Sequence, residues 1–314
     1  MIIRHDRSQR GSLLPVYAGI WFAVIAWGGS FVAARVLLNA GIAGKTALSP
    51  AILATLRFGI ASLFFLIPLL KVIVRRQISA RNLLRMAFLG QISFSLYFWL
   101  QYTGVQQTNA SISSILVVGL IPVVTAFLAQ VIGGEKFSPL RLAALLLGFC
   151  GVVLIVLQKP IAVSLRSGFL FGAVCLVSNA FAFAIYSNLS KRWMQGISPL
   201  VMTGGTMMSG ALGLLLLSLV DPVNNRWDAV VRLSAIQWGA LFFLAVVCSV
   251  VAYFVYNFAL TKIEASRVAV YIYFEPVVTV LLGVSLLSER LSWQTLVGAA
   301  VIAASVLIVN LLTG

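Results

Sequence analysis

The chain is poor in charge, above all in negative charge. Asp and Glu number 7 and Lys and Arg 22 among 314 residues, and charged residues make up 9% of the chain against 61% for hydrophobic residues. Soluble domains carry about 25% charged residues, so this composition argues against one. The net charge of +15 could suit a nucleic-acid partner. The sequence has no basic stripe and no nucleic-acid motif, so we expect no such partner.

Histidine and cysteine are scarce as well. His5 is the only histidine, and the three cysteines (Cys150, Cys175 and Cys248) lie inside apolar segments. This pattern argues against a disulfide framework and against a metal site built from spaced His and Cys residues. The sequence has no Walker loop, which argues against direct drive by ATP. We therefore expect no enzyme activity, no metal and no cofactor.

Long apolar runs dominate what is present. Thr108 to Gly134 is a stretch of 27 residues without one charged side chain, and about 20 helical residues cross the hydrocarbon core of a bilayer. The same reading along the chain predicts ten transmembrane helices. Their expected ranges are 13–38, 47–70, 83–103, 108–133, 139–158, 167–190, 198–220, 235–260, 265–288 and 292–312.

Lys and Arg also predict the orientation of these helices. With the N-terminus in the cytoplasm, the inner segments carry 14 of these residues and the outer loops carry 6, while Arg35 and Arg57 lie within helices. Cytoplasmic loops are enriched in Lys and Arg. We therefore predict that both termini are cytoplasmic.

The sequence repeats itself at a shift of 154 residues. The segment 121–125 (IPVVT) returns as 275–279 (EPVVT), and 7 of 17 positions are identical between 122–138 and 276–292. The repeat unit contains five helices, and an odd number places the second copy upside down in the membrane. The predicted fold is thus all-α integral membrane, with two inverted five-helix repeats. The expected divisions are a cytoplasmic tail at 1–12, repeats at 13–158 and 167–314, and a connecting loop at 159–166.

Three short motifs accompany this repeat. Two of them are Trp27-Gly-Gly-Ser-Phe31 and Leu56-Arg57-Phe58. The third is Pro-Val-Val-Thr, which occurs at 122–125 and 276–279 and is followed in each half by a glutamate, Glu135 or Glu289. Together they resemble the EamA-type members of the drug/metabolite transporter superfamily. The resemblance implies alternating-access transport of small metabolites, often amino acids or drugs leaving the cell. It also implies a central cavity lined by the first, third, fourth, sixth, eighth and ninth helices, with the fifth and tenth as scaffold.

Glu275 is the foremost candidate for chemistry. It lies about 10 residues into the predicted helix 265–288, close to the bilayer midplane. A charge there costs roughly 2.5–3.5 kcal/mol, and its repeat-mate is the apolar Ile121. Glu275 is therefore either a carboxylate for coupling or substrate binding, or a structural partner of a neighbouring helix. Protons are the coupling ion that such a group would use.

Two arginines lie within predicted helices. Ser49-Pro50 and Ser198-Pro199 align the second helix of each half at a shift of 149 residues, at which Arg57 pairs with Thr206. The buried guanidinium of Arg57 needs a partner, for which Glu275 is the carboxylate expected at mid-depth, so Arg57 is either a structural anchor or a substrate contact. Arg35 lies near the outer end of the first helix. It either extends to the interface or faces the mouth of the cavity.

Polar and aromatic side chains cluster on the helices that the resemblance assigns to the cavity. A ligand site combines an apolar aromatic wall with a few polar groups, although each such residue can equally bond a neighbouring helix. The candidates are Tyr97, Gln101, Asn179, Tyr186, Tyr253, Tyr256, Asn257 and Tyr271.

Prolines and acidic residues at equivalent points of the two halves complete the set. Pro122 and Pro276 interrupt two predicted helices and are candidate hinges, although membrane helices also tolerate proline without such a role. Glu135 and Glu289 are expected to bond free amides of the helix that follows each of them.

Taken together, these features predict a secondary transporter that exports small amphipathic metabolites such as amino acids. One alternative is a non-transporting membrane scaffold or subunit. Another is a nucleotide-sugar or phosphate-ester carrier of the same fold, which would need several basic residues in its cavity. We expect a small-molecule substrate, contact with the lipid bilayer, and a place in a bacterial inner membrane. The sequence leaves the oligomeric state open.

Overall fold

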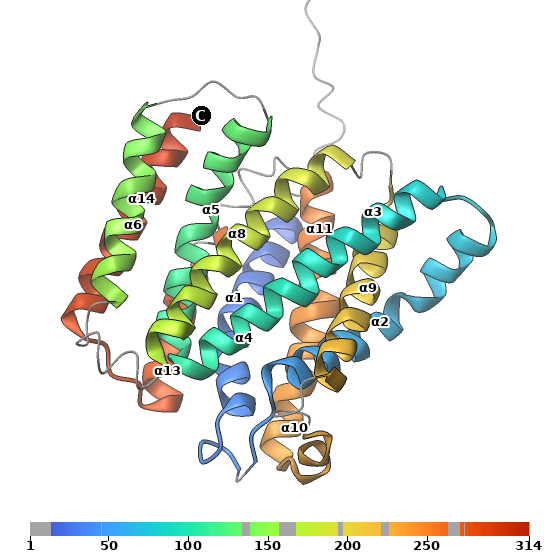
Figure 1. Cartoon of the computed structure of the whole chain (residues 1–314), viewed down its shortest axis with the longest axis horizontal. Helices are drawn as coiled ribbons and strands as arrows, with labels where there is room; N and C mark the ends of the chain where they lie inside the picture. Colours follow the sequence, from blue (N-terminus) through green and yellow to red (C-terminus); the bar gives the residue numbers. More distant parts are fainter. Residues whose placement is uncertain are drawn as a thin grey trace, which may run out of the picture.

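The protein consists of helices throughout the part that its computed structural model describes, and that part contains no strand (Figure 1). The described residues are 14–44, 46–133, 139–156, 168–193, 197–220, 226–262, 271–272 and 274–313. The long helices that contain neither a π-helical nor a 3₁₀ segment are α1 (Leu14–Leu38), α2 (Pro50–Val74), α5 (Ala110–Gly133), α6 (Pro139–Val156), α8 (Phe169–Trp193), α9 (Pro199–Val220), α13 (Glu275–Leu287) and α14 (Trp293–Thr313).

Two further helices each contain a π-helical segment. The first runs through α3 (Ala80–Gly90), η2 (Gln91–Leu96) and α4 (Tyr97–Gln107). The second runs through α10 (Ala235–Phe242), η4 (Phe243–Val251) and α11 (Ala252–Lys262). Both lie where the apolar pattern predicted a single helix, over 83–103 and 235–260.

Serine caps set several of the helix starts. The side chain of Ser49 accepts the amide of Ile52 at 3.3 Å, and Pro50 occupies the first helical position. Proline fits there because that position needs no amide donor. Ser234 caps α10 in a capping box with Gln237. These caps explain why the starts of α2 and α10 lie within a few residues of the predicted ones.

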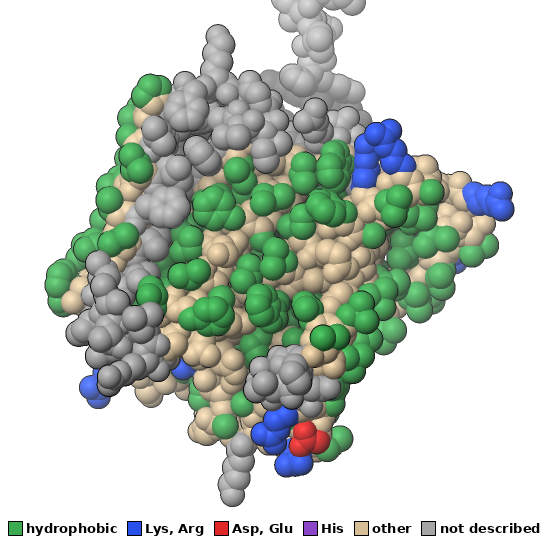
Figure 2. Space-filling model, viewed as in Figure 1, with side chains coloured by type: hydrophobic (Ala, Val, Ile, Leu, Met, Phe, Trp, Pro, Cys, Tyr) green, Lys and Arg blue, Asp and Glu red, His purple; other side chains and the backbone are tan. Residues whose placement is uncertain are grey.

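Six helical stretches are long and apolar enough to cross a membrane, and three shorter described helices are also apolar. Large hydrophobic side chains point outward along them, such as Leu63, which is 65% exposed, and Leu216, which is 64% exposed. On the face drawn in Figure 2 hydrophobic side chains cover the middle, and Lys and Arg lie toward the margins. Water does not favour such a surface, so the protein is a multi-pass membrane protein.

The helices of the two sequence halves pack across one another. α2 packs against α9, α5 against α8, and α1 against both α11 and α13. α6 packs against α14, and this pair stands at one side of the bundle (Figure 1). The cavity described below lies among helices of both halves: α1, α2, α4 and α5 of the first and α8, α9, α11 and α13 of the second.

Small residues allow α9 to approach its neighbours closely, as the Gly205-xxx-Ser209-xxx-Gly213 spacing predicts. The Gln91 amide donates to the Ser209 carbonyl at 2.7 Å, and the Ser209 hydroxyl donates to the carbonyl of Ala87 at 2.9 Å. A polar bond inside a bilayer holds two helices in register because water does not compete for it.

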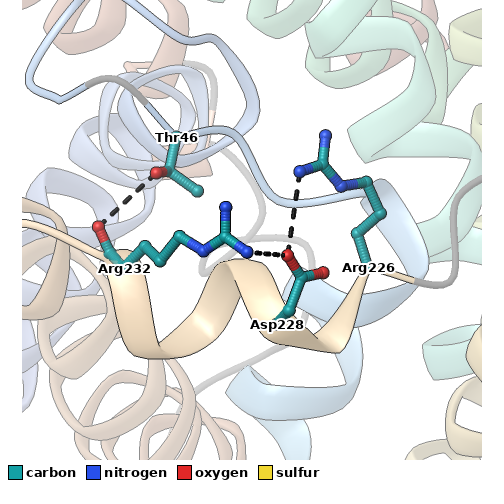
Figure 3. A network of polar contacts seen from close by, with 4 residues as sticks. All are labelled: Thr46, Arg226, Asp228 and Arg232. Atoms are coloured by element: carbon teal, nitrogen blue, oxygen red, sulfur yellow. Dashed lines mark hydrogen bonds and ion pairs between the residues drawn. The ribbon is translucent and has the colours of Figure 1, made fainter.

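A short 3₁₀ helix, η3 (Trp227–Arg232), lies beside the chain between α1 and α2 (Figure 3). The Asp228 carboxylate accepts a hydrogen bond from the Arg232 guanidinium at 2.6 Å, and it lies 3.8 Å from the guanidinium of Arg226. Thr46 donates to the carbonyl of Arg232 at 3.5 Å. These side chains are exposed, so the ion pairs contribute little to stability.

Candidate functional site

A cavity of about 140 Å³ lies between the two sequence halves. This volume holds on the order of five to ten water molecules, or a small solute. Half of the residues in its wall are aromatic, and several of the others are polar. The lining residues are Trp27, Ser30, Phe31, Arg57, Phe94, Tyr97, Phe98, Gln101, Val118, Ile121, Phe183, Tyr186, Thr203, Thr206, Tyr253, Tyr256, Ile272 and Glu275.

Arg57 supplies the positive charge of this wall and is only 2% exposed. Its Nε donates to the Ser249 hydroxyl at 2.7 Å, and its Nη1 donates to the Tyr102 hydroxyl at 2.8 Å. The guanidinium carbon also lies 4.9 Å from the ring centroid of Phe58 and 4.8 Å from that of Phe98. Hydroxyl oxygens and ring faces thus solvate the charge in place of water.

The predicted ion pair between Arg57 and Glu275 is absent, although both residues are described and both line the cavity. The prediction was wrong because it considered only carboxylates as partners for a buried guanidinium. The hydroxyls of Ser249 and Tyr102 take that place. The cation and the carboxylate therefore remain separate features of one cavity.

Glu275 supplies the negative charge and is 6% exposed. It is the first residue of α13, not a residue deep within a continuous helix as predicted. Pro276 explains the start, since proline has no amide donor and suits the first helical turn. The amides at a helix start favour a carboxylate there, which lowers the cost of burying Glu275. Residues 263–270 and 273, which fall in the same predicted helix, lie outside the described residues.

α1 approaches the start of α13 very closely at Gly28. A methyl group on Gly28 would lie 2.7 Å from Cβ of Val278 and 2.9 Å from the carbonyl oxygen of Glu275. The Thr279 hydroxyl donates to the carbonyl of Gly28 at 2.8 Å. Only glycine permits this contact, which accounts for the first glycine of the Trp-Gly-Gly-Ser-Phe motif.

Most of the predicted site residues meet at the cavity. Besides Arg57 and Glu275, those that line it are Tyr97, Gln101, Tyr186, Tyr253 and Tyr256. The Oε1 atom of Gln101 is buried and has no hydrogen-bond partner in the described structure. A buried amide oxygen without a partner is costly, so a donor on a bound solute would relieve that cost.

Two further predicted residues, Asn179 and Arg35, do not line the cavity. Asn179 is fully buried and donates to the carbonyl of Tyr97 at 2.6 Å. Arg35 donates to the carbonyls of Val105 and Gln106 at 2.7 and 2.9 Å, near the end of α4. Cations suit the carbonyls at a helix C-terminus. Arg35 thus neither lines the cavity nor extends freely to the interface.

Tyr271 also lies away from the cavity lining, because its ring packs against Tyr17 and Trp21 of α1 at centroid distances of 5.9 and 5.3 Å. The side chain of Asn257 lies outside the described residues. Pro122 lies inside α5, which continues through it, and its side chain is also outside the described part.

Glu289, which was expected to bond the helix that follows it, bonds a different helix. Glu289 accepts the amides of Ala110 and Ser111 at 2.9 and 3.1 Å, so it caps α5 and not the helix that follows it. The expectation assumed that the nearest free amides in sequence are the nearest in space. Glu135 lies outside the described residues.

Sequence reasoning identified Arg57 but missed α9 as a source of the wall. α2 and α9 both contribute, through Arg57, Thr203 and Thr206, although the resemblance implied neither helix. The pairing of Arg57 with Thr206 in the repeat was the signal for α9. Trp27 was seen only as part of a family motif, yet its ring lies 5.2 Å from those of both Tyr253 and Tyr256.

Several known proteins are similar to this chain over most of its length. An uncharacterized transporter of Archaeoglobus fulgidus is 29% identical over 288 residues, which cover 90% of this chain and 93% of that protein. The uncharacterized inner membrane transporter YedA of Escherichia coli K12 is 24% identical, over 95% of this chain and 92% of its own. A chloroplastic WAT1-related protein of Arabidopsis thaliana is 31% identical over 66% of this chain and 50% of its own length.

A solved crystal structure covers 96% of this chain and 99% of its own at a TM-score of 0.60 and 19% identity, which shows a shared fold. The model of the EamA-like transporter family matches the sequence twice, over residues 14–157 and 170–311. With the membrane-spanning helices and the central cavity, these two matches place the chain in the EamA-like transporter family.

Proposed function

We propose that the protein is a secondary transporter that exports small amphipathic metabolites, such as amino acids, by alternating access. The observation that carries this proposal is one buried cation and one buried carboxylate, Arg57 and Glu275, on the wall of a single aromatic cavity. The described structure contains no ion pair between them, so each charge can face a charge of opposite sign on a zwitterion.

The hydrogen-bonding capacity of Arg57 suits this role. A guanidinium has five N–H donors, and the bonds to Ser249 and Tyr102 use Nε and Nη1. Further donors remain for a substrate carboxylate. A substrate ammonium would then face Glu275, and its apolar part would lie against rings such as Phe98 and Tyr253.

Two inverted five-helix halves, with ten helices in all, are the architecture that this function requires. Equivalent positions of the repeat, Ile121 with Glu275 and Arg57 with Thr206, line the same cavity, which supports a pseudo-twofold axis through it. An axis of that kind lets the cavity open to each side of the membrane in turn.

The packing of α2 against α9 supports the inversion. A methyl group on Gly205, near the start of α9, would lie 3.7 Å from Leu69, near the end of α2. The two helices therefore run antiparallel. Helices in equivalent places of two inverted halves are expected to do so.

The alternatives fit the cavity less well. A carrier of nucleotide sugars or phosphate esters would need several cations, and Arg57 is the only Lys or Arg among the described lining residues. A scaffold without transport would carry the cost of two buried charges in a cavity and gain nothing from it.

Glu275 is the group that we propose couples transport to protons. If the cavity opens to each side in turn, this carboxylate can take up a proton on one side and release it on the other. Glu275→Gln retains the size and hydrogen-bonding capacity of the side chain but cannot titrate. We expect the variant to bind substrate and to lose the acceleration of flux by a pH gradient.

Reconstituted liposomes test this with radiolabelled L-phenylalanine, with and without an imposed pH gradient. Asp228→Asn is the matched control, since it removes a carboxylate from exposed η3, outside the cavity. Full gradient-driven flux in Glu275→Gln would contradict proton coupling at this residue. Absence of flux for every amino acid in the wild-type protein would contradict the substrate class.

A further inference from the structure

The two π-helical segments occupy matching places in the two halves. η2 covers 91–96, and the repeat shift of 154 moves it to 245–250, inside η4 at 243–251. π-helical turns are rare and are found frequently at functional sites. Cavity-lining residues follow both segments directly: Tyr97 and Gln101 follow η2, and Tyr253 and Tyr256 follow η4.

A π-turn changes which backbone groups are bonded. The amide of Ala252, at the end of η4, donates to the carbonyl of Val247, five residues back. In an α-helix the same amide would donate to Cys248. The Cys248 carbonyl therefore lacks its usual donor, and a buried carbonyl in that state is costly.

Trp27 of α1 supplies the missing donor. Its indole N–H donates to the Cys248 carbonyl at 2.9 Å, and the Cys248 thiol donates back to the carbonyl of Ala26 at 3.1 Å. α1 is thus joined to η4 by two bonds in opposite directions. The next residue, Ser249, is the one that accepts Nε of Arg57.

The other half has a related contact at a different point of its π-helical segment, since the Tyr97 amide donates to Ile92 and the carbonyl without its α-helical donor there is that of Ser93. Asn179 of α8 donates to the carbonyl of Tyr97, the first residue after η2. α1 and α8 are the first helices of the two halves. In each case the first helix of one half donates a side-chain hydrogen bond to the π-containing helix of the other half.

We infer that Trp27 is a positioning residue for transport, which holds η4 in its π-helical form by a hydrogen bond to the carbonyl of Cys248. The inference rests on the proposed function, because the groups it positions are those of the transport cavity. If η4 returned to α-helical bonding, the residues that follow it would rotate about the helix axis by about 100° relative to those that precede it. Ser249 would then leave Arg57, and the cavity would lose its fixed cation.

Removal of the Trp27 N–H tests this directly. Trp27→Phe deletes the donor and keeps an aromatic ring, and 3-benzothienylalanine at position 27 keeps the bicyclic shape with sulfur in place of N–H. The control is the same pair of replacements at Trp21, which lies on the same helix, outside the cavity lining. The readout is amide hydrogen exchange of residues 243–256 in the full-length protein in lipid nanodiscs.

We expect exchange of this segment to become about three- to tenfold faster in both position-27 variants and to stay unchanged in both Trp21 controls. In liposomes, the KM for L-phenylalanine should rise more than the maximal rate falls. Unchanged exchange with 3-benzothienylalanine at position 27 would overturn the inference. Exchange needs no substrate, so an absence of flux for every amino acid in the wild type would contradict the proposed substrate class and leave this result decisive.

Discussion

The bond between Tyr102 and Arg57 gives a stability prediction with a magnitude. Tyr102→Phe removes the hydroxyl that accepts Nη1 of Arg57 at 2.8 Å and changes no other atom. Tyr102 is 2% exposed, and it is not one of the residues that line the cavity. Loss of the hydroxyl therefore acts on the buried cation and not on a substrate contact.

Two scales bracket the expected cost. Neutral hydrogen bonds between membrane helices average about 0.6 kcal/mol in double-mutant cycles. Hydrogen bonds to charged groups contribute about 1.5–3 kcal/mol, and a buried charge cannot find water as a substitute. Ser249 and the rings of Phe58 and Phe98 remain, so we expect Tyr102→Phe to lower the free energy of unfolding by about 2 kcal/mol.

Reversible unfolding in mixed detergent micelles, followed by tryptophan fluorescence, measures this change. Tyr17→Phe is the control, because that tyrosine contacts Tyr271 through its ring, and we expect a change within about 0.5 kcal/mol. Ser249→Ala should interact with Tyr102→Phe non-additively, since both hydroxyls bond one guanidinium. A Tyr102→Phe protein as stable as the control would refute our account of how the charge is held.

Three further predictions concern packing, capping and orientation. Gly28→Ala should lower the free energy of unfolding by about 1–3 kcal/mol because its methyl group meets Val278, whereas Gly59→Ala, which meets nothing within 4 Å, should be neutral or stabilising. Glu289→Gln should cost about 1–2 kcal/mol in the same assay, since the amides at the start of α5 lose a charged acceptor, and an unchanged stability would contradict this. A single cysteine at Ser79, in a cysteine-free background, should react only with reagents that enter the cytoplasm, and labelling from outside would reverse the predicted topology.

Helix positions could be predicted well because apolar length and capping are local properties. The start of α9 was expected at Ser198-Pro199, and the helix begins at Pro199. The repeat relates more than the order of the helices, because its shift of 154 residues places η2 within η4. The π-turns themselves leave no mark in hydropathy, which is why each was predicted as an ordinary helix.

The partners of the buried charges could not be predicted in the same way. Ser249 lies 192 residues from Arg57 in sequence, and nothing in either segment marks the contact. The sequence did identify the buried charges, because an ionisable residue in an apolar run is conspicuous. It could not identify the uncharged groups that hold them, because serine and tyrosine are common in membrane helices.

The cavity is shared between the two sequence halves, and this has a consequence for how the protein can be assembled. Arg57 comes from the first half, while Glu275 and the hydroxyl of Ser249 come from the second. Each half made as a separate polypeptide would lack one of the two charges, and the first would also leave its guanidinium short of an acceptor. On the proposed function we expect neither fragment to transport alone, whereas the two produced together contain every group of the site. Selection for activity would then act on the halves as a pair, so that a change in one is tolerated only when the other still fits it.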